Sequence, residues 1–211
     1  MNFQGVIPAR GGSKGIKNKN LAFFKGKPLI YWTLEQAKAS KILDDFFVSS
    51  DDEEILKYAE KQGVKTHERD KSLAEDNSTT LELLEDLNRN KDFVSQNYVI
   101  LQPTSPLRKR GIIDRCIEEY LLNKYDCLAT GRICKNYEWG KTNNTGRQNL
   151  SGWFYDDGSI YVLSKKLIDD GKWHGENSGK ILQEHPWHLE IDSPSDLKIL
   201  EYISKNLEDF I

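Results

Sequence analysis

Short apolar runs alternate along the chain with longer segments in which apolar residues recur every three or four positions. Runs of the first kind are typical of buried strands, and the longer spacing is typical of helices that cover a sheet. The short runs lie at residues 3–7, 46–48, 64–67, 98–101, 127–133, 159–163 and 187–191. The helical segments lie at 28–39, around 55–59, around 81–87, at 110–122 and at 194–207. This alternation predicts an α/β fold with a mostly parallel central sheet and helices on both of its faces.

The alternation is interrupted once, over residues 134–157, where the sequence is polar and shows little periodicity. A chain of 211 residues fits one domain. A core of that size needs no disulfide or structural metal to be stable. We therefore predict a single domain over residues 1–211, with an insertion at about 134–157.

Composition excludes several classes of protein. Hydrophobic residues make up 37% of the chain and charged residues 30%, which argues against disorder, and no apolar run is long enough to span a bilayer. The net charge of −3 disfavours a nucleic-acid partner. The N-terminus shows no signal segment, and the three cysteines, Cys116, Cys127 and Cys134, form no Cys-x-x-Cys pair. These features predict reduced thiols in a cytoplasmic protein with no membrane partner.

Ligands of parallel α/β sheets bind outside the carboxyl ends of the strands, which directs attention to four loops. These loops follow Ile7, Val48, Leu101 and Ile191. The first, at residues 8–20, contains glycines at 11, 12 and 15 and the four cations Arg10, Lys14, Lys17 and Lys19. Glycines allow tight turns that bring N–H groups close to a ligand, and clustered cations suit a polyphosphate. The spacing matches neither a Walker A loop nor Gly-x-Gly-x-x-Gly. A solvated basic turn is the alternative, but the position directly after the first strand favours a phosphate site.

Several short blocks, in order over nearly the whole chain, carry a resemblance to a known family. The blocks are Ile7-Pro8-Ala9-Arg10-Gly11-Gly12-Ser13-Lys14-Gly15 with Lys19-Asn20-Leu21, Gly26-Lys27-Pro28-Leu29-Ile30, Val48-Ser49-Ser50-Asp51, Arg69 with Leu73-Ala74 and Asp76, Leu101-Gln102-Pro103-Thr104-Ser105-Pro106-Leu107-Arg108, and Glu190-Ile191-Asp192. Together they resemble the acylneuraminate cytidylyltransferases, also called CMP-sialic acid synthetases, whose bacterial relatives act on legionaminic and pseudaminic acids. The resemblance implies a Rossmann-like nucleotidyltransferase fold.

The resemblance also implies a reaction, in which CTP and a nine-carbon 2-keto sugar acid give the CMP-sugar and pyrophosphate. The protein's contribution to such a phosphoryl transfer is mainly placement and electrostatics. The catalytic residues it implies are Arg10, Lys14, Lys19 and Asp192. The nucleotide-binding residues it implies are Arg10, Gly11, Gly12, Ser13, Lys14, Lys19, Asn20, Arg69, Ser78 and Thr80. Lys17 lies at a less constrained position and is interpreted as a surface charge.

Glu190 and Asp192 are the candidate metal ligands. They lie two positions apart at a predicted strand, which places both carboxylates on one face. Two such carboxylates repel each other unless a cation lies between them, and Mg²⁺ prefers one or two carboxylates together with phosphate oxygens. The resemblance assigns both residues to Mg²⁺ (or Mn²⁺), although relatives often carry Asp where this chain has Glu190. The alternative is that Asp192 or Ser193 caps the last helix, in which Asp196 is expected to be structural.

The remaining loops supply candidates for the base and the sugar. The resemblance places Arg69 near cytosine, with Ser78 and Thr80 beside it, while residues 78–80 also suit a helix N-cap. Asp51 either bonds within the site or caps the next helix. A neutral amide such as that of Gln102 can donate to and accept from sugar hydroxyls. Gln102, Thr104 and Ser105 are therefore the predicted sugar-binding residues, and the last two also suit a simple turn.

The insertion is the least defined region. In the family that the chain resembles, it often swaps across a homodimer and completes the partner's sugar pocket. Its cations are Arg132, Lys135, Lys141 and Arg147, and its aromatic residues Trp139, Trp153, Phe154 and Tyr155 suit either an interface or a local core. His185 is interpreted as a surface residue. Other hypotheses are a Kdo-type or GTP-using sugar nucleotidyltransferase, and a non-catalytic nucleotide-sugar binding protein.

Overall fold

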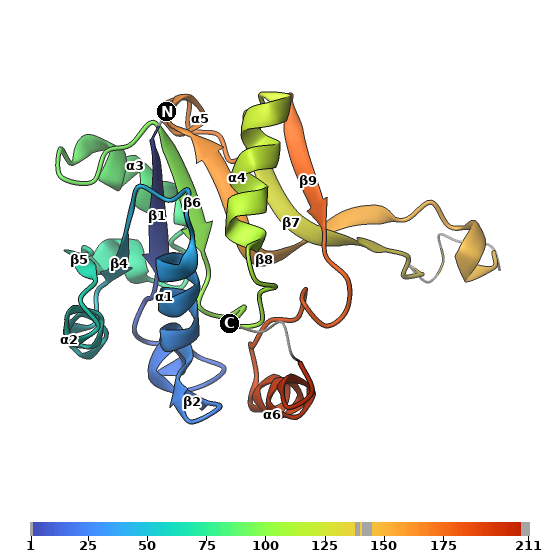
Figure 1. Ribbon diagram of the computed structural model, residues 1–211, viewed down its shortest axis with the longest axis horizontal. Helices are drawn as coiled ribbons and strands as arrows, with labels where there is room; N and C mark the ends of the chain where they lie inside the picture. The colour runs from blue at the N-terminus through green and yellow to red at the C-terminus, as the bar shows by residue number, and fades with distance from the viewer. Residues whose placement is uncertain (1, 138–139, 141–144, 208–211) are drawn as a thin grey trace.

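The computed structural model describes residues 2–137, 140 and 145–207. Its main sheet has seven strands in the order β5-β4-β1-β6-β8-β7-β9 (Figure 1). The strands are β1 (Phe3–Pro8), β4 (Asp45–Ser50), β5 (Lys65–Glu68), β6 (Asn97–Leu101), β7 (Cys127–Cys134), β8 (Trp153–Ser164) and β9 (Ser178–Leu182). Only β8 is antiparallel to its neighbours in this sheet. The predicted mostly parallel α/β sheet is confirmed.

Helices cover both faces of the sheet, as the alternation of apolar residues along the strands requires. On one face, α1 (Leu29–Ala39), α2 (Glu53–Lys61) and α4 (Ile112–Asn123) pack on side chains such as Ile7 and Val99. On the other, α3 (Thr80–Arg89) and the short α5 (Lys165–Asp169) pack on side chains such as Val6 and Ile100. Val6 and Ile7 are adjacent in β1 and point to opposite cores.

A third, smaller core lies beside the carboxyl edge of the sheet, under α6 (Pro194–Ser204) (Figure 1). It joins Leu107 and Ile191 to the short hairpin of β2 (Phe23–Phe24) and β3 (Lys27–Pro28). Ser193 is the N-cap of α6 and forms a capping box with Asp196, with Pro194 in the first turn. The predicted cap and the structural role of Asp196 are therefore confirmed.

The predicted strand at 187–191 is wrong. This segment forms turns and an irregular stretch, in which the Ile191 N–H bonds the Thr104 carbonyl at 2.7 Å. Ile191 is buried in the third core, and the partly buried Trp187 and Leu189 pack against that core rather than in a sheet, which explains the misleading alternation. The seventh strand is instead β9, whose five residues include only two large apolar side chains, Ile181 and Leu182.

The predicted insertion is more regular than its composition suggested. Gly131–Cys134 of β7 pair with Trp153–Asp156 of β8, beyond a register shift after Ala129. We call these paired ends the hairpin arm, which extends away from the rest of the sheet (Figure 1). Irregular polar composition was a poor guide here because pairing with a partner strand fixes this backbone, and a bulge redirects it.

Two other local predictions require correction or refinement. Asp51 was one candidate for the cap of α2, but the N-cap is Asp52, whose side chain accepts from the N–H groups of Glu54 and Ile55. For α3, the N-cap within the predicted segment is Thr79, which forms a capping box with Glu82.

Candidate active site

A cavity of about 330 Å³ lies at the carboxyl ends of β1, β5 and β6. Its walls include most of the side chains that the sequence assigned to nucleotide and metal. Those lining it are Arg10, Ser13, Lys14, Lys19, Asn20, Arg69, Ser78, Thr80, Gln102, Thr104 and Asp192. A larger hollow of about 820 Å³ lies beside α5 and β9, and it is lined by none of the predicted site residues. The residues that line the smaller cavity therefore identify it as the candidate active site.

The loop after β1 is held in shape by hydrogen bonds between its backbone and the side chains of Asp51 and Asn20. Gly11 N–H donates to Asp51 Oδ1 at 2.9 Å, which shows that Asp51 bonds within the site instead of capping α2. Asn20 Nδ2 donates to the Arg10 carbonyl at 2.9 Å. Gly12 has φ +61°, and a Cβ on Gly15 would lie 2.1 Å from the Asp192 carbonyl oxygen. Glycine is required at 15 because only a residue without a side chain can approach residue 192 so closely.

Two cations of this loop point at one carboxylate. Asp76 Oδ2 lies 2.5 Å from Lys14 Nζ, and its Oδ1 lies 3.2 Å from Arg10 Nη1. The hydrogen bond from Lys14 lowers the pKa of Asp76 below its usual range, burial opposes this shift, and the hydrogen bond from Arg10 lowers the pKa further. An exposed pair of this kind contributes little to stability. A polyphosphate can therefore compete with Asp76 for both cations at low cost.

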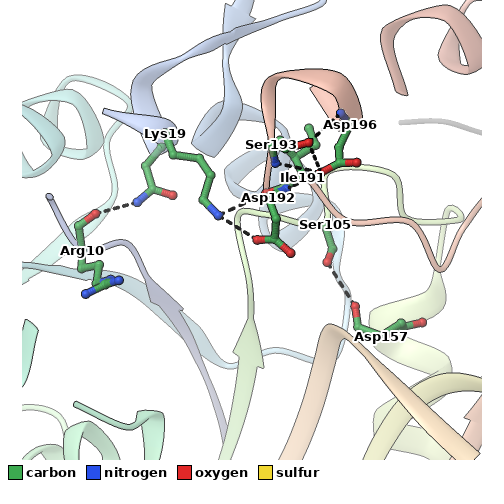
Figure 2. A network of polar contacts seen from close by, with 9 residues as sticks. Arg10, Lys19, Ser105, Asp157, Ile191, Asp192, Ser193 and Asp196 are labelled. Carbon is green, nitrogen blue, oxygen red and sulfur yellow. Dashed lines mark hydrogen bonds and ion pairs between the residues drawn. The ribbon is translucent and has the colours of Figure 1, made fainter. Parts of the chain in front are cut away.

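The third cation joins the loop to the far wall of the cavity. Lys19 Nζ donates to the Ile191 carbonyl at 3.1 Å and lies 3.0 Å from Asp192 Oδ1 (Figure 2). The Lys19 side chain is 15% exposed, whereas that of Asp192 is 68% exposed. Lys19 is therefore fixed by packing and by the backbone, and the Asp192 carboxylate remains open to the cavity.

Arg69 forms the wall opposite the loop. Its side chain is almost fully buried, and its Nη2 donates to the Ser49 carbonyl at 2.9 Å. Burial lowers its pKa to about 10, so it stays charged at neutral pH. Ser78 and Thr80 lie beside it at the start of α3, where Ser78 Oγ donates to the Ser72 carbonyl at 2.7 Å.

Gln102 and Thr104 line the side of the cavity toward β8, while Ser105 lies beneath the surface. Ser105 Oγ donates to the Asp157 carbonyl at 3.4 Å (Figure 2). The structure thus turns this predicted sugar residue into the interior. Gln102 itself is held from below, because Arg108 Nη2 donates to its carbonyl at 2.6 Å.

The two candidate metal ligands diverge because residues 187–191 are not a strand. Asp192 faces the cavity, whereas a Cβ added at Gly158 would lie 2.9 Å from Glu190 Oε2, so that carboxyl lies against β8. Burial, and then the charges of Asp192 and Asp157, raise the pKa of Glu190 to about 7. No cluster of three metal-ligating side chains occurs among the residues that the structure describes. One open carboxylate fits Mg²⁺, which usually takes one or two carboxylates plus phosphate oxygens.

A family model described as cytidylyltransferase matches residues 4–149 of the chain. The chain belongs to the cytidylyltransferase family. The predicted nucleotidyltransferase class and fold are therefore confirmed.

Curated relatives of this cytidylyltransferase include the pseudaminic acid cytidylyltransferase of Campylobacter jejuni, which is 39% identical over 95% of each chain. The N-acylneuraminate cytidylyltransferase A of Danio rerio is 29% identical, and the alignment covers 93% of this chain but 49% of that protein. The chain thus spans about half the length of some relatives and almost the full length of others. No described helix of this cytidylyltransferase is long and apolar enough to cross a membrane.

Solved structures show the same fold. A CMP:2-keto-3-deoxy-manno-octonic acid synthetase complexed with CTP superposes with a TM-score of 0.76 at 14% identity, covering 98% of this chain and 100% of that one. A cytidylyltransferase from Leptospira borgpetersenii superposes with a TM-score of 0.70 at 19% identity, covering 100% of this chain and 90% of the other. At such identities the likeness concerns the fold alone.

The cations predicted in the insertion do not gather at the cavity. Arg132 stacks over the Tyr155 ring at 5.3 Å in the hairpin arm, Lys135 is half-buried, and Arg147 is exposed in a short 3-10 helix. Lys141 and Trp139 lie outside the described residues. His185 is exposed, as predicted, and its ring lies 5.6 Å from that of His188.

Sequence reasoning missed a buried polar network beneath Gln102 and β8 of this cytidylyltransferase. Asp157 is 1% exposed, and its carboxylate accepts from Thr130 Oγ1 at 2.6 Å, the Ser159 N–H at 3.0 Å and Gln183 Nε2 at 2.5 Å. Arg108 is likewise 1% exposed and donates to Gln102, Ser159 and two residues of α1. The only signal in the sequence was an arginine placed soon after a buried strand.

Proposed function

We propose that this cytidylyltransferase transfers CMP from CTP to the anomeric hydroxyl of an acidic nine-carbon 2-keto sugar and releases pyrophosphate. The observation that supports this most directly is the cavity itself. Its walls combine the cations of the loop after β1, the buried Arg69 and the open carboxylate of Asp192. A triphosphate, a base and a metal each have a suitable partner in one space.

In this proposal the phosphates lie against Arg10, Lys14 and Lys19. The triphosphate takes the place of Asp76 as the partner of Arg10 and Lys14. The hydroxyl oxygen attacks the α-phosphorus in line, the bond from that phosphorus to the bridging oxygen breaks, and pyrophosphate leaves. The hydroxyl proton passes to solvent. Lys19, which is held by the Ile191 carbonyl, stabilises the charge that develops on the phosphate oxygens because its position needs no reorganisation.

Asp192 is the residue that we propose would hold Mg²⁺ (or Mn²⁺), and such an ion would neutralise phosphate oxygens there. Lys19 positions this carboxylate from one side at 3.0 Å. Glu190 lies behind Asp192. A raised pKa is expected for a carboxyl group that lies near two other acidic residues. A cation at Asp192 would draw Glu190 toward its charged form.

The sugar is the least constrained part of the proposal. Gln102 and Thr104 offer amide and hydroxyl groups on the wall toward β8. Pseudaminic acid is the first candidate, because the Campylobacter jejuni relative that carries this name aligns over 95% of each chain. Sialic and legionaminic acids share the carboxylate and the anomeric hydroxyl and remain in the same proposed class.

The deciding experiment measures pyrophosphate release with CTP and Mg²⁺ against pseudaminic, legionaminic, sialic and Kdo acids. We expect release with one nine-carbon acid and little with ATP, GTP or UTP. Release with Kdo alone would indicate the Kdo-type alternative. Tight CTP binding without release from any acid would favour a non-catalytic nucleotide-sugar binding protein.

We also propose that the protein forms a homodimer through the hairpin arm. Ile133, Trp153 and Tyr155 are 44%, 52% and 47% exposed on this arm, which is a large apolar surface for two short paired strands. Sedimentation velocity tests the proposal: Trp153→Ser should shift the protein toward monomer. The control is Tyr202→Ser, which removes an even more exposed aromatic side chain from α6. A wild-type monomer would overturn it.

The three cysteines are all buried free thiols. This supports a reducing compartment such as the cytoplasm as the proposed location.

A further inference from the structure

Arg69 is held in place by one residue of the neighbouring strand. Its Nε donates to Ser49 Oγ at 3.2 Å and its Nη2 to the Ser49 carbonyl at 2.9 Å, while its backbone N–H bonds the Ser50 carbonyl at 2.8 Å. Nε and Nη2 form one edge of the planar guanidinium. The remaining donors, on Nη1 and the outer side of Nη2, are then left for a ligand in the cavity that Arg69 lines.

Ser49 has a second partner in the interior. Ser49 in β4 and His67 in β5 are directly opposite in the parallel ladder, and Ser49 Oγ lies 3.0 Å from His67 Nδ1. Arg69 can only donate, so the serine oxygen accepts from it. His67 Nδ1 is the only acceptor for the serine hydrogen among the hydrogen bonds of the described residues, and we therefore assign Nδ1 as that acceptor. The network therefore assigns His67 as a neutral ring with its proton on Nε2.

The surroundings of His67 favour this neutral form. The ring is 7% exposed, and the rings of Phe47 and Phe93 lie 6.2 and 4.8 Å from it. Burial lowers the pKa of His67, the cation of Arg69 lowers it further, and Asp86 of α3 opposes both effects. The other charge on this side is Lys65, whose Nζ lies over the Phe93 ring at 4.4 Å.

We propose that Ser49 and His67 are positioning residues for nucleotide recognition, which act by fixing the Arg69 guanidinium in the orientation that meets the base. His67 aligns the serine hydroxyl, and the hydroxyl aligns Arg69. The inference rests on the proposed function, because it requires Arg69 to contact the base of CTP. His67 itself does not line the cavity, so in this proposal it acts without contacting the phosphates.

We predict that substitution of Ser49 or His67 weakens binding of the base and leaves binding of the phosphates nearly unchanged. Calorimetric titration of Ser49→Ala and His67→Phe with CTP should show binding that is weaker by about 3- to 10-fold, the range for losing one hydrogen bond. Binding of inorganic tripolyphosphate should stay within about twofold, since the loop cations are untouched. His67→Asn retains a side-chain acceptor near the position of Nδ1 and should restore most of the CTP affinity.

The pH dependence gives a second readout. Protonation of His67 would put a charge beside Arg69 and a donor on Nδ1, where an acceptor is needed. The ratio of CTP to tripolyphosphate affinity should therefore fall as the pH is lowered from 7 toward 5.5 in the wild type. It should stay flat in His67→Phe and His67→Asn. The ligands titrate identically in all three proteins, so the difference between the wild type and the two variants isolates the contribution of His67.

Ser50→Ala is the matched control, because Ser50 is buried on the same strand but its Oγ accepts from the Asp52 N–H at 3.0 Å and not from Arg69. It should change stability without changing the affinity ratio. Equal CTP affinity in wild type, Ser49→Ala and His67→Phe overturns the proposal, and so does an equal loss for CTP and tripolyphosphate. A folded wild type that binds tripolyphosphate but not CTP overturns the proposed function itself.

Discussion

The two sides of the cavity are built in different ways. On the proposed phosphate side, the site residues lie in the loops that follow β1 and β5, and the parallel ladder of β1, β4 and β5 brings these loops together. On the sugar side, at β8, β7 and β9, the corresponding groups come from a bulged hairpin, a buried carboxylate network and an irregular segment at 183–192. The first side can be encoded locally, whereas the second depends on contacts between distant segments.

Lys19 is the sharpest test of the phosphate side. We expect Lys19→Ala to reduce turnover about 100-fold or more, since it removes a fixed cation from the proposed phosphate site. Steady-state kinetics with varied CTP measures the effect. Lys17→Ala is the control, because that side chain is exposed in the same loop and does not line the cavity. Similar kinetics for the two variants would remove Lys19 from the proposed site.

Asp192 lies where the two sides meet. Asp192→Asn should lower turnover about 100-fold and raise the Mg²⁺ concentration needed for half-maximal rate, because the open carboxylate is lost. The matched control is Asp196→Asn, which weakens the capping box of α6 and should cost about 0.5–2 kcal/mol of stability. It should leave the Mg²⁺ requirement unchanged. An unaltered Mg²⁺ curve for Asp192→Asn would contradict the metal assignment.

Lys19 and Asp192 are residues that could be picked out from the sequence. Cations between glycines, a Ser-Pro-x-Asp cap and the blocks around Arg69 and Gln102 are local patterns, and the predicted sheet placed them at one edge. The strand at 187–191 was wrong because alternation records burial and cannot tell a sheet from the small core under α6. β9 was missed because an edge strand needs few apolar residues. The Asp157 network had no signal, since its partners Thr130 and Gln183 are 27 and 26 positions away.

Arg108 connects the two sides. Its guanidinium donates to Thr33 and Gln36 of α1 at 2.9 Å and to the carbonyls of Gln102 and Ser159 at 2.6 and 2.9 Å. Arg108→Met should reduce the free energy of unfolding by about 1–3 kcal/mol, because buried acceptors lose a partner. We also expect a higher KM for the sugar acid and a smaller change in the KM for CTP, since the Gln102 loop is released.

Urea denaturation and two-substrate kinetics measure these effects. Arg110→Met provides the control, as Arg110 is exposed two residues further along. Equal increases in both KM values would indicate that Arg108 supports the whole cavity and not its sugar side in particular.

Glu190 gives the smallest effect and tests the sugar side alone. Its pKa is raised from 4.5 to about 7, so the folded state binds this proton more tightly than the unfolded state. The stabilisation from the protonated carboxyl is therefore present below about pH 4.5 and is lost as the pH rises through about 7. Glu190→Gln, which is always neutral, should match the wild type at pH 5 and exceed its stability at pH 8 by at most about 3 kcal/mol.

Denaturation in EDTA at the two pH values measures this difference, and Glu184→Gln, an exposed position in the same segment, should show none. Saturating Mg²⁺ with CTP should narrow the gap at pH 8, because a cation at Asp192 offsets the repulsion that disfavours the charged Glu190. If Glu190→Gln were no more stable than the wild type at pH 8, the carboxyl would be solvated in the folded protein. The sugar side would then be more open than the phosphate side, and its acids would be free to contact the sugar directly.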